Sequence, residues 1–231
     1  MAAKLVVDIE TIGHDFDQLD HTTQGVLTRW IKKESNNDDE YRVALDDLKN
    51  GLGFSPLTGE IVAIGVLDVE KNKGAVYYQA PKKEIKDFEE NGIKFKSMPE
   101  KEMLEKFWEV TKEYDEFITF NGRGFDAPFL MIRSAIHKIR PSKDLMSHRY
   151  DKKHIDLMDI LSFYGAVRRK GSLHLFCRAF DIKSPKADGL TGDDVGTLFK
   201  EKKFLEIAKY NVGDLYATKE LYHYWDKYLR F

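Results

Sequence analysis

The stretch that decides the fold is KLVVDIETIG, residues 4–13, close to the start of the sequence. An apolar run typical of a buried strand comes first, and Asp8 and Glu10 follow directly behind it. Because side chains alternate along a strand, these two carboxylates point to the same face, one pleat apart. The stretch therefore predicts a core strand over residues 4–9 that ends in an acidic pair in need of a partner.

The overall composition limits what that partner can be. The chain has 231 residues, of which 42% are hydrophobic and 13% aromatic, enough for one well-packed domain. The 37 basic and 39 acidic residues nearly cancel, so a polyanion would have to be bound by local patches or by metal ions. Cys177 is the single cysteine, which excludes an internal disulfide and a cysteine-built zinc site. No apolar stretch approaches the roughly 18 residues of a membrane span, so we expect a cytoplasmic protein without a membrane partner.

Strand and helix patterns alternate through the middle of the chain. Residues 60–69 and 74–79 are strand-like and are joined by the turn-rich sequence EKNKG, which predicts a β-hairpin. A helical pattern follows Pro99, with the proline in its first turn, and a second helical pattern follows the strand-like run at 116–120. This alternation predicts the α/β class.

A polar segment, residues 14–56, separates the first strand from the second. Its apolar positions predict two short helices, with the loop sequence ESNNDDE between them. We therefore expect residues 1–231 to form a single domain with a helical insertion at about 14–56.

A second group of polar residues lies in ITFNGRGFDAPFL, where a strand runs into the loop 121–124 and Asp126 heads the next helix. Taken alone, Asp126 is typical of a helix N-cap, because aspartate accepts hydrogen bonds from the free backbone amides there. Ligand sites in open α/β sheets, however, form outside the carboxyl ends of the strands. Asp8, Glu10 and Asp126 all lie at such an end, so two strands bring acids to one edge of the sheet.

The third group lies in KYNVGDLYATKEL, on a helical run predicted over about 191–229 with a break near Lys200. Tyr210 and Asp214 are four residues apart and therefore share one helix face, and that face is otherwise apolar. A partly buried Asp214 paired with a lysine is the alternative reading of this acid. The neighbouring Gly213 costs a helix about 1 kcal/mol relative to alanine, which is tolerable if another group must approach closely.

Together, DIET at 8–11, NGRGFD at 121–126 and YNVGD at 210–214 resemble the three motifs of the DEDDy 3′–5′ exonucleases. The likeness is greatest to the exonuclease domain of family B DNA polymerases and to stand-alone predicted exonucleases related to it. Another branch of these enzymes carries a histidine where this chain has Lys209, so the tyrosine branch matches better. The resemblance implies a ribonuclease H-like mixed sheet with one antiparallel strand, flanked by helices.

The resemblance also implies that four carboxylates converge, namely Asp8, Glu10, Asp126 and Asp214. Like charges about 4 Å apart repel by roughly 4 kcal/mol per pair at an effective dielectric constant near 20, so such a cluster requires cations or protons. Ligands that offer only oxygen suit Mg²⁺ or Mn²⁺. Two such ions would clamp an in-line displacement at phosphorus, and no small-molecule cofactor is implied.

The family likeness further implies a role for each side chain. Asp8 would bridge both ions, and Glu10 and Asp214 would each complete one coordination shell. Asp126 would hold the outer ion, largely through water. Tyr210 would orient the attacking water or help to deprotonate it, although a tyrosine at this spacing is also compatible with a core aromatic.

The implied substrate is the 3′ end of single-stranded nucleic acid, with DNA favoured over RNA, and the implied products are nucleoside monophosphates. We expect Thr11 and Ile12 to pack against the terminal nucleotide, and Asn121 and Phe125 to help seat the strand. The basic runs at 152–154 and 168–170 are candidate phosphate contacts, although charged runs are usually solvated faces.

Two weaker features complete the candidate site. Residues 186–189 are similar to a loop near the active site in this family. Asp156 and Asp159 are typical of helix starts, and Asp156 could also support the ligands.

Other functions compete with an exonuclease. A ribonuclease H-like fold can survive as a catalytically silent nucleic-acid binding module, but such a module has no use for repelling carboxylates. An RNA-directed exonuclease or an endonuclease stays open, because RNA is selected through contacts to the 2′ hydroxyl that no motif here reveals. A structural Ca²⁺ site would need closely spaced ligands in one loop, whereas these acids are scattered along the chain.

Overall fold

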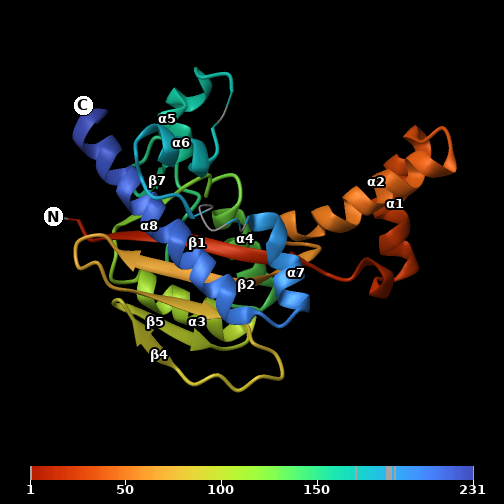
Figure 1. Cartoon of the computed structure of the whole chain (residues 1–231), viewed down its shortest axis with the longest axis horizontal. Helices are drawn as coiled ribbons and strands as arrows, with labels where there is room; N and C mark the ends of the chain where they lie inside the picture. Colours follow the sequence, from red (N-terminus) through yellow and green to blue (C-terminus); the bar gives the residue numbers. More distant parts are fainter. Residues whose placement is uncertain (1, 170, 186–188, 190, 231) are drawn as a thin grey trace.

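The computed structural model describes residues 2–169, 171–185, 189 and 191–230. The strands in this part of the chain are β1 (Lys4–Gly13), β2 (Gly59–Asp68), β3 (Gly74–Tyr78), β4 (Phe88–Glu90), β5 (Ile93–Ser97), β6 (Glu116–Thr119) and β7 (His154–Asp156). They form one sheet in the order β4-β5-β3-β2-β1-β6-β7. Helices lie on both of its faces (Figure 1), which confirms the α/β class.

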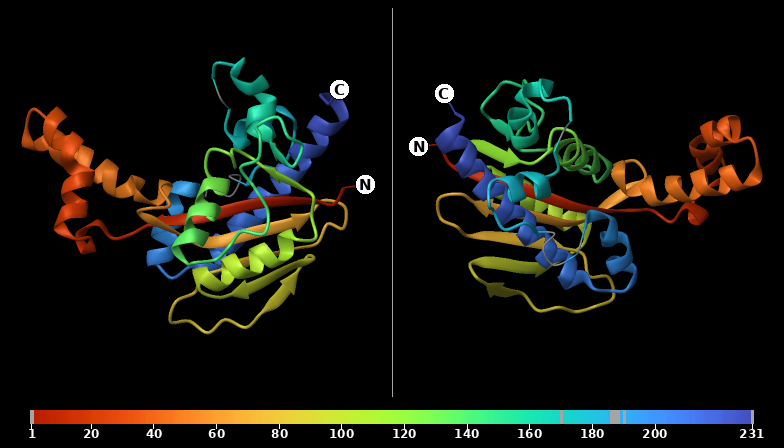
Figure 2. Two further views of the ribbon diagram at one scale, coloured as in Figure 1. Left: turned by 180° about the vertical axis from the view of Figure 1, so that it is seen from behind. Right: turned by 45° about the horizontal axis from the view of Figure 1, so that its top comes forward.

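The helices of the described residues are α1 (His21–Glu34), α2 (Asp38–Gly51), α3 (Glu100–Thr111), α4 (Asp126–Ile136), α5 (Leu157–Leu161), α6 (Leu173–Ala179), α7 (Val195–Lys200) and α8 (Phe204–Tyr228). Helix α8 crosses one face of the sheet over β1 and β2, while α3 and α4 cover the other face (Figures 1 and 2). The break in the last helical run falls between α7 and α8, close to the predicted position.

The sheet is mixed, as predicted. Strand β2 runs antiparallel to β1 and to β3, so the predicted hairpin is present, whereas β1 is parallel to β6 and β6 is parallel to β7. At the other edge, β5 runs parallel to β3, and the short β4 pairs antiparallel with β5. The family resemblance implied one antiparallel strand, whereas both β2 and β4 run against the other strands of the sheet. The sequence analysis did not predict β4, β5 or β7, and β4 and β7 have only three residues each, too few to give a period-2 pattern.

Strand β1 is longer than the sequence predicted. Its pairing with β2 continues to Gly13, with an irregularity between Glu10 and Thr11, whereas its pairing with β6 extends only to Val6. The prediction ended the strand at Ile9 because the apolar run stops there. The polar residues that follow stay in the strand because they pair with the long strand β2. The acidic pair therefore lies inside β1, just beyond the carboxyl end of β6.

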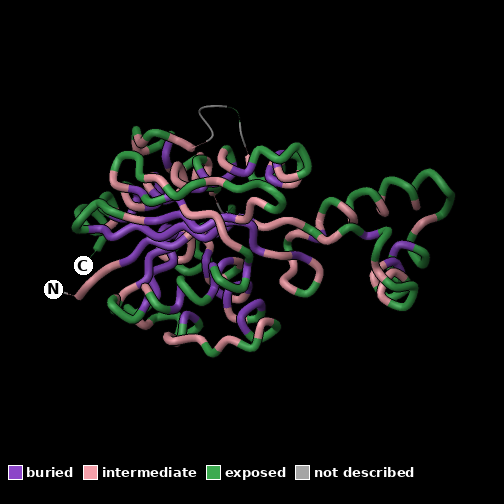
Figure 3. Tube along the Cα trace, turned by 90° about the horizontal axis from the view of Figure 1, so that it is seen from below, coloured by how far each residue is buried: buried purple, intermediate pink, exposed green. Residues whose placement is uncertain are grey.

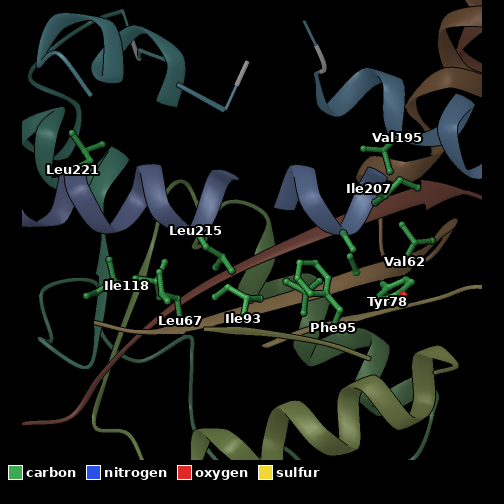
Figure 4. Close-up of a cluster of buried hydrophobic side chains, with 14 of the residues drawn as sticks. Val62, Leu67, Tyr78, Ile93, Phe95, Ile118, Val195, Ile207, Leu215 and Leu221 are labelled. Carbon is green, nitrogen blue, oxygen red and sulfur yellow. The ribbon is translucent and has the colours of Figure 1, made fainter. Parts of the chain in front are cut away.

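Alternate residues of β1 serve two separate cores. Leu5, Val7 and Ile9 belong to the core under α3 and α4, while Val6 belongs to the core under α8. Figure 4 shows this second core, in which Leu215 of α8 lies above the sheet. Since side chains alternate along a strand, Val6 shares its face with the acidic pair, which therefore points toward α8.

The helices α1 and α2 project away from the sheet as a pair (Figures 1 and 2), and most of their surface is exposed (Figure 3). Each begins at a side-chain cap: the carboxylate of Asp20 accepts from the Thr23 amide at 3.0 Å, and Asn37 accepts from the Glu40 amide at 2.9 Å. The Thr11 hydroxyl donates to the carbonyl of Gly53 at 2.7 Å, which fixes the base of this helical pair to β1.

Helix α3 differs from the prediction by one position. Pro99 is its N-cap residue rather than part of its first turn, as suits a residue that cannot donate a backbone hydrogen bond. Among the described residues, no helix is long and apolar enough to pass through a lipid bilayer.

Candidate active site

Three of the four predicted acids meet between the sheet and α8. Asp8 and Glu10 reach this place from β1 and Asp214 reaches it from α8, and one carboxylate oxygen of each lies within 4.8 Å of the others. Glu10 is buried, and the other two are half-buried. The cluster exists because α8 crosses β1, which brings together side chains about 200 residues apart in the sequence.

Asp126 lies beside this cluster and binds β1 itself. One of its carboxylate oxygens accepts a hydrogen bond from the backbone amide of Ile9 at 3.0 Å, the residue between the two acids of β1. Asp126 is 4% exposed. The N-cap of α4 is Phe125, and no side-chain cap bond is present there, so the N-cap reading of Asp126 is wrong. Its carboxylate instead fixes the strand segment that carries the acidic pair.

Burial and mutual repulsion keep these acids far from their ordinary titration range. Burial first, and then the charge of Asp214, raise the pKa of both Asp8 and Glu10 well above their ordinary values. Burial likewise raises the pKa of Asp126 to about 7, against the opposing effect of the hydrogen bond from Ile9. Among the ion pairs of the described residues, none joins Asp8, Glu10 or Asp126 to a lysine or arginine. The charge is therefore left for a cation or for protons to balance.

Asn211 is a part of this site that the sequence analysis missed. Its side-chain amide donates to Asp8 at 2.7 Å and, at the long distance of 3.5 Å, to Glu10. Its oxygen is buried without a hydrogen-bond partner among the described residues. A Cβ atom on Gly65 of β2 would lie 1.9 Å from that oxygen, so only glycine fits there.

A signal for Asn211 was present in the sequence. An asparagine three residues before Asp214 lies on nearly the same helix face, inside the quoted motif YNVGD. Only the crossing of α8 over β1, however, shows which acids its amide reaches.

Tyr210 stands beside the acids at the edge of a cavity. Its ring is half-buried, and burial first, followed by the charges of Asp214, Glu10 and Asp8, raises the pKa of its hydroxyl above the ordinary tyrosine value. The hydroxyl is therefore protonated at neutral pH and acts as a hydrogen-bond donor. The cavity that Tyr210 lines has a volume of about 490 Å³ and is also lined by Pro185 and Gly213.

Asp156 shapes the loop that leads to Asp126. Its carboxylate accepts hydrogen bonds from the backbone amides of Asn121 and Arg123, both at 2.9 Å, and it caps α5 by accepting from Met158 at 3.0 Å. This confirms its role at a helix start. Asn121 has a φ of +63°, a conformation that asparagine tolerates better than most residues.

The residues predicted to contact the substrate differ in how far they are already engaged by the protein itself. The hydroxyl of Thr11 is already bonded to Gly53, and Ile12 packs against the core under α8. The ring of Phe125 packs edge-on against Phe54, with the ring centres 6.4 Å apart. Phe54 is 66% exposed, so an aromatic surface borders the end of β1.

The basic runs are only partly suited to bind phosphate. His154 is buried, and its two ring nitrogens are hydrogen-bonded to the carbonyl of Leu145 at 2.7 Å and to the hydroxyl of Thr119 at 2.8 Å, so its prediction as a phosphate contact is wrong. Lys152, Lys153, Arg168 and Arg169 are exposed. Lys170 and residues 186–188 lie outside the described residues.

The donor set fits a divalent cation with a preference for oxygen. Asp8, Glu10 and Asp214 offer three carboxylate oxygens within 4.8 Å of one another, and hard ions such as Mg²⁺ and Mn²⁺ take such ligands. A bound cation would reverse the repulsion that raises the pKa values of these acids.

Comparison with known proteins agrees with this geometry. Residues 59–228 match the family described as "Predicted 3'-5' exonuclease related to the exonuclease domain of PolB". This match includes Asp126, Tyr210 and Asp214 but begins after β1 and the helices α1 and α2. No curated protein sequence matches the chain.

A solved structure shares the fold. The family B DNA polymerase from the hyperthermophilic archaeon Pyrobaculum calidifontis superposes with a TM-score of 0.58 at 15% sequence identity. The alignment covers 97% of this chain and 24% of the polymerase chain, so the chain spans about a quarter of the length of that polymerase. The mixed sheet flanked by helices is thus the predicted ribonuclease H-like fold.

Proposed function

Because this chain belongs to the family of predicted 3′–5′ exonucleases related to the exonuclease domain of family B DNA polymerases, we propose that it removes nucleotides from the 3′ end of single-stranded nucleic acid with the help of divalent cations. The observation that carries the proposal is the meeting of Asp8, Glu10 and Asp214 within 4.8 Å. We further propose that residues 1–231 act as one exonuclease domain, in which residues 14–56 are an insertion.

In this proposal, Asp8, Glu10 and Asp214 hold Mg²⁺ or Mn²⁺, two ions by analogy with the family, and Asp126 would support one of them, largely through water. When bound, the ions supply positive charge that favours ionisation of water and stabilises the leaving 3′ oxygen. Asn211 donates to Asp8 at 2.7 Å and so sets the direction of its other carboxylate oxygen. Asp126 holds the backbone between Asp8 and Glu10, which keeps both side chains on the face toward α8.

Tyr210 orients the attacking water in this scheme. Without cations the hydroxyl is a hydrogen-bond donor, because burial and the neighbouring acids raise its pKa; bound cations would offset the charge of those acids, so Tyr210 would hold the water or help to deprotonate it. Attack at phosphorus then releases a nucleoside monophosphate and leaves a strand one nucleotide shorter. We propose Thr11, Ile12, Asn121 and Phe125 as contacts of the last nucleotide.

The test is a time course with DNA and RNA oligonucleotides of the same sequence, each labelled at the 5′ end, with Mg²⁺ or Mn²⁺. We expect a ladder that shortens by single nucleotides from the 3′ end, faster for DNA, and complete inhibition by EDTA. Internal fragments at early times, or no cleavage with either metal, would refute the proposal. Binding without cleavage would instead support the silent nucleic-acid binding module.

A further inference from the structure

A second cavity lies beyond the loop that carries Asp126. It has a volume of about 520 Å³ and opens between β7, α5 and the C-terminal end of α8, which lie together at one corner of the molecule (Figure 1). Its walls combine aromatic rings with cations, among them Tyr150, Tyr164, Trp225, Arg123, Arg149 and Arg230. We call it the α5 pocket.

Three aromatic rings of the α5 pocket face solvent. Tyr150 is 64% exposed, Phe163 59% and Tyr164 40%, and the rings of Tyr150 and Tyr164 meet edge-on with their centres 4.8 Å apart. Phe163 and Tyr164 both have positive φ angles, 50° and 55°, which are rare for bulky residues. Strained backbone of this kind clusters at functional sites, and here it presents rings that no core covers.

Two guanidinium groups of the pocket lie against aromatic rings. The guanidinium of Arg149 lies 5.6 Å from the centre of the Tyr164 ring and forms hydrogen bonds of 2.6 and 2.8 Å with Asp159. The guanidinium of Arg230 lies 5.4 Å from the centre of the Trp225 ring. A planar guanidinium next to an exposed ring suits an aromatic base that carries a phosphate.

Arg123 has one group with no partner. Its Nη2 donates to the carbonyls of Ser147 and His148 at 2.8 and 3.1 Å, but its Nε is buried with no hydrogen-bond partner among the described residues. Asp151, Asp156 and Asp159 also line the pocket, so its net charge is close to neutral. Stacking on the rings, and not charge alone, must therefore provide the affinity.

The α5 pocket and the candidate active site share the loop that leads to Asp126. Asp156 accepts hydrogen bonds from the backbone of Asn121 and Arg123, so the loop leading to Asp126 is also a wall of the pocket. Helix α8 carries Asp214 at one site and Trp225 at the other, eleven residues apart, about 16 Å along the helix axis. A stacked strand that advances about 3.4 Å per nucleotide covers this distance in about five nucleotides, and an extended strand needs fewer.

We propose that the α5 pocket holds an unpaired base of the same nucleic-acid strand whose 3′ end occupies the candidate active site, about three to five nucleotides from that end. This inference rests on the proposed exonuclease function. It explains why exposed rings and ordered guanidinium groups are built next to the loop of Asp126. A strand too short to reach the pocket gains nothing from it.

Photochemical cross-linking tests the pocket without any need for cleavage. Ten-nucleotide strands, each with one 5-iodouracil at a different distance from the 3′ end, are irradiated with the full chain in Ca²⁺, which also takes oxygen ligands, and the attached peptide is identified by mass spectrometry. We expect cross-links to Tyr150, Tyr164 or Trp225 from bases three to five nucleotides from the end. Attachment only to other residues would overturn the inference. So would equally efficient attachment of free 5-iodo-2′-deoxyuridine monophosphate, which would assign the pocket to a free nucleotide.

Cleavage kinetics provide an independent test. Tyr150→Ala should raise KM for a ten-nucleotide strand about tenfold, as expected for the loss of one stacked base, and should leave the cleavage of a dinucleotide unchanged. The control is Tyr228→Ala, because Tyr228 is 62% exposed on α8 but does not line the pocket. Equal losses on both substrates, or none, would contradict the inference. If the wild type cleaves neither strand, the proposed function fails, and the cross-links alone decide the pocket.

Discussion

Asp8 is repelled by three other carboxylates and held by one amide. Burial and the charges of Asp214, Asp126 and Glu10 raise its pKa, while the amide of Asn211 donates to it at 2.7 Å. A side chain in this position destabilises the metal-free protein and becomes favourable only with a cation or a proton. At the scale of single residues, the carboxylates that would bind the metal therefore lower the stability of the metal-free protein.

The first prediction concerns substitutions that remove one of the repelling carboxylates. Asp8→Ala and Asp214→Asn should each abolish nuclease activity, since each removes a metal ligand. In EDTA both variants should melt at a higher temperature than the wild type, because repulsion is lost; for a chain of this size each 1 kcal/mol corresponds to about 2–4 °C. Calorimetry and the cleavage time course measure the two effects.

The control for that pair is Glu113→Gln, which changes an exposed acid after α3. It should alter neither activity nor melting temperature. Near-normal turnover in Asp8→Ala or Asp214→Asn would contradict the assignment of these ligands.

A second prediction concerns Asn211. Asn211→Ala removes the hydrogen bond that sets the direction of Asp8, and loss of such a supporting group typically costs 10–100-fold in metal affinity or activity. We expect the Mn²⁺ concentration for half-maximal activity to rise within that range. Asn50→Ala, an exposed asparagine on α2, should leave the metal dependence unchanged. An unchanged dependence in Asn211→Ala would show that the amide has no role in metal binding.

At the scale of elements, the position of α8 on the sheet depends on Gly65. A Cβ atom there would lie 1.9 Å from the Asn211 oxygen and 2.8 Å from Leu215 Cδ1, so Gly65→Ala must displace these two side chains, which pack α8 against β2. We expect a loss of about 1–3 kcal/mol, typical of overpacking, together with a large loss of activity as Asp214 is displaced. Chemical unfolding and cleavage rates measure both.

Gly196→Ala is the matched control, because nothing lies within 4 Å of a Cβ atom added there. Alanine is favoured over glycine in a helix by about 1 kcal/mol, so this variant of α7 should be slightly more stable. If Gly65→Ala proved as harmless, the close approach of α8 to β2 would be wrong.

An ion pair on the other face of the sheet joins three elements. The buried Glu100 of α3 accepts two hydrogen bonds from Arg133 of α4, at 2.8 and 2.6 Å, and one from the Ile61 amide of β2 at 2.8 Å. Burial alone would raise the pKa of Glu100, but these hydrogen bonds outweigh it and lower that pKa. The carboxylate therefore stabilises the fold above the ordinary glutamate pKa of about 4.3, and this stability is lost as the pH falls through the lowered value.

Glu100→Gln should consequently cost about 3–5 kcal/mol at neutral pH, because it leaves the guanidinium of Arg133 buried without its counter-charge. The difference from the wild type should shrink below about pH 4. Urea unfolding at pH 7 and pH 3.5 gives both values. A difference that is the same at both pH values would show that Glu100 is not the source of the acid sensitivity.

At the scale of the whole molecule, a cation bound by Asp8 and Glu10 of β1 and by Asp214 of α8 should raise the free energy of unfolding, because its ligands come from both ends of the chain. A ligand that binds only the folded chain stabilises it by about 2.7 kcal/mol at a concentration of 100 Kd, which is about 5–10 °C for a protein of this size. We predict a rise of that size in melting temperature with saturating Mn²⁺, and no rise in Asp8→Ala. An undiminished rise in the variant would place the metal elsewhere.

The sequence alone determined the strands β1, β2, β3 and β6, the helices α1 to α4, α7 and α8, and the acids on these elements. The alternation in KLVVDIETIG placed Asp8 and Glu10 on one face, the turn-rich EKNKG marked the hairpin of β2 and β3, and helical spacing paired Tyr210 with Asp214. These features are local, because strand and helix periods are fixed by the backbone over a few residues. Local rules failed where pairing partners decide the outcome, as in the extension of β1 to Gly13 and the three-residue β4.

Only the tertiary structure decided which groups meet. The bond from Ile9 to Asp126, the amide of Asn211 on Asp8 and the burial of His154 each depend on contacts between segments distant in sequence. No periodicity encodes such contacts, since they follow from the way in which α8 and the loop at 121–124 pack against β1. The sequence therefore supplied the acidic residues, and the crossing of α8 over the sheet brought Asp8, Glu10 and Asp214 together, because packing alone sets distances between remote side chains.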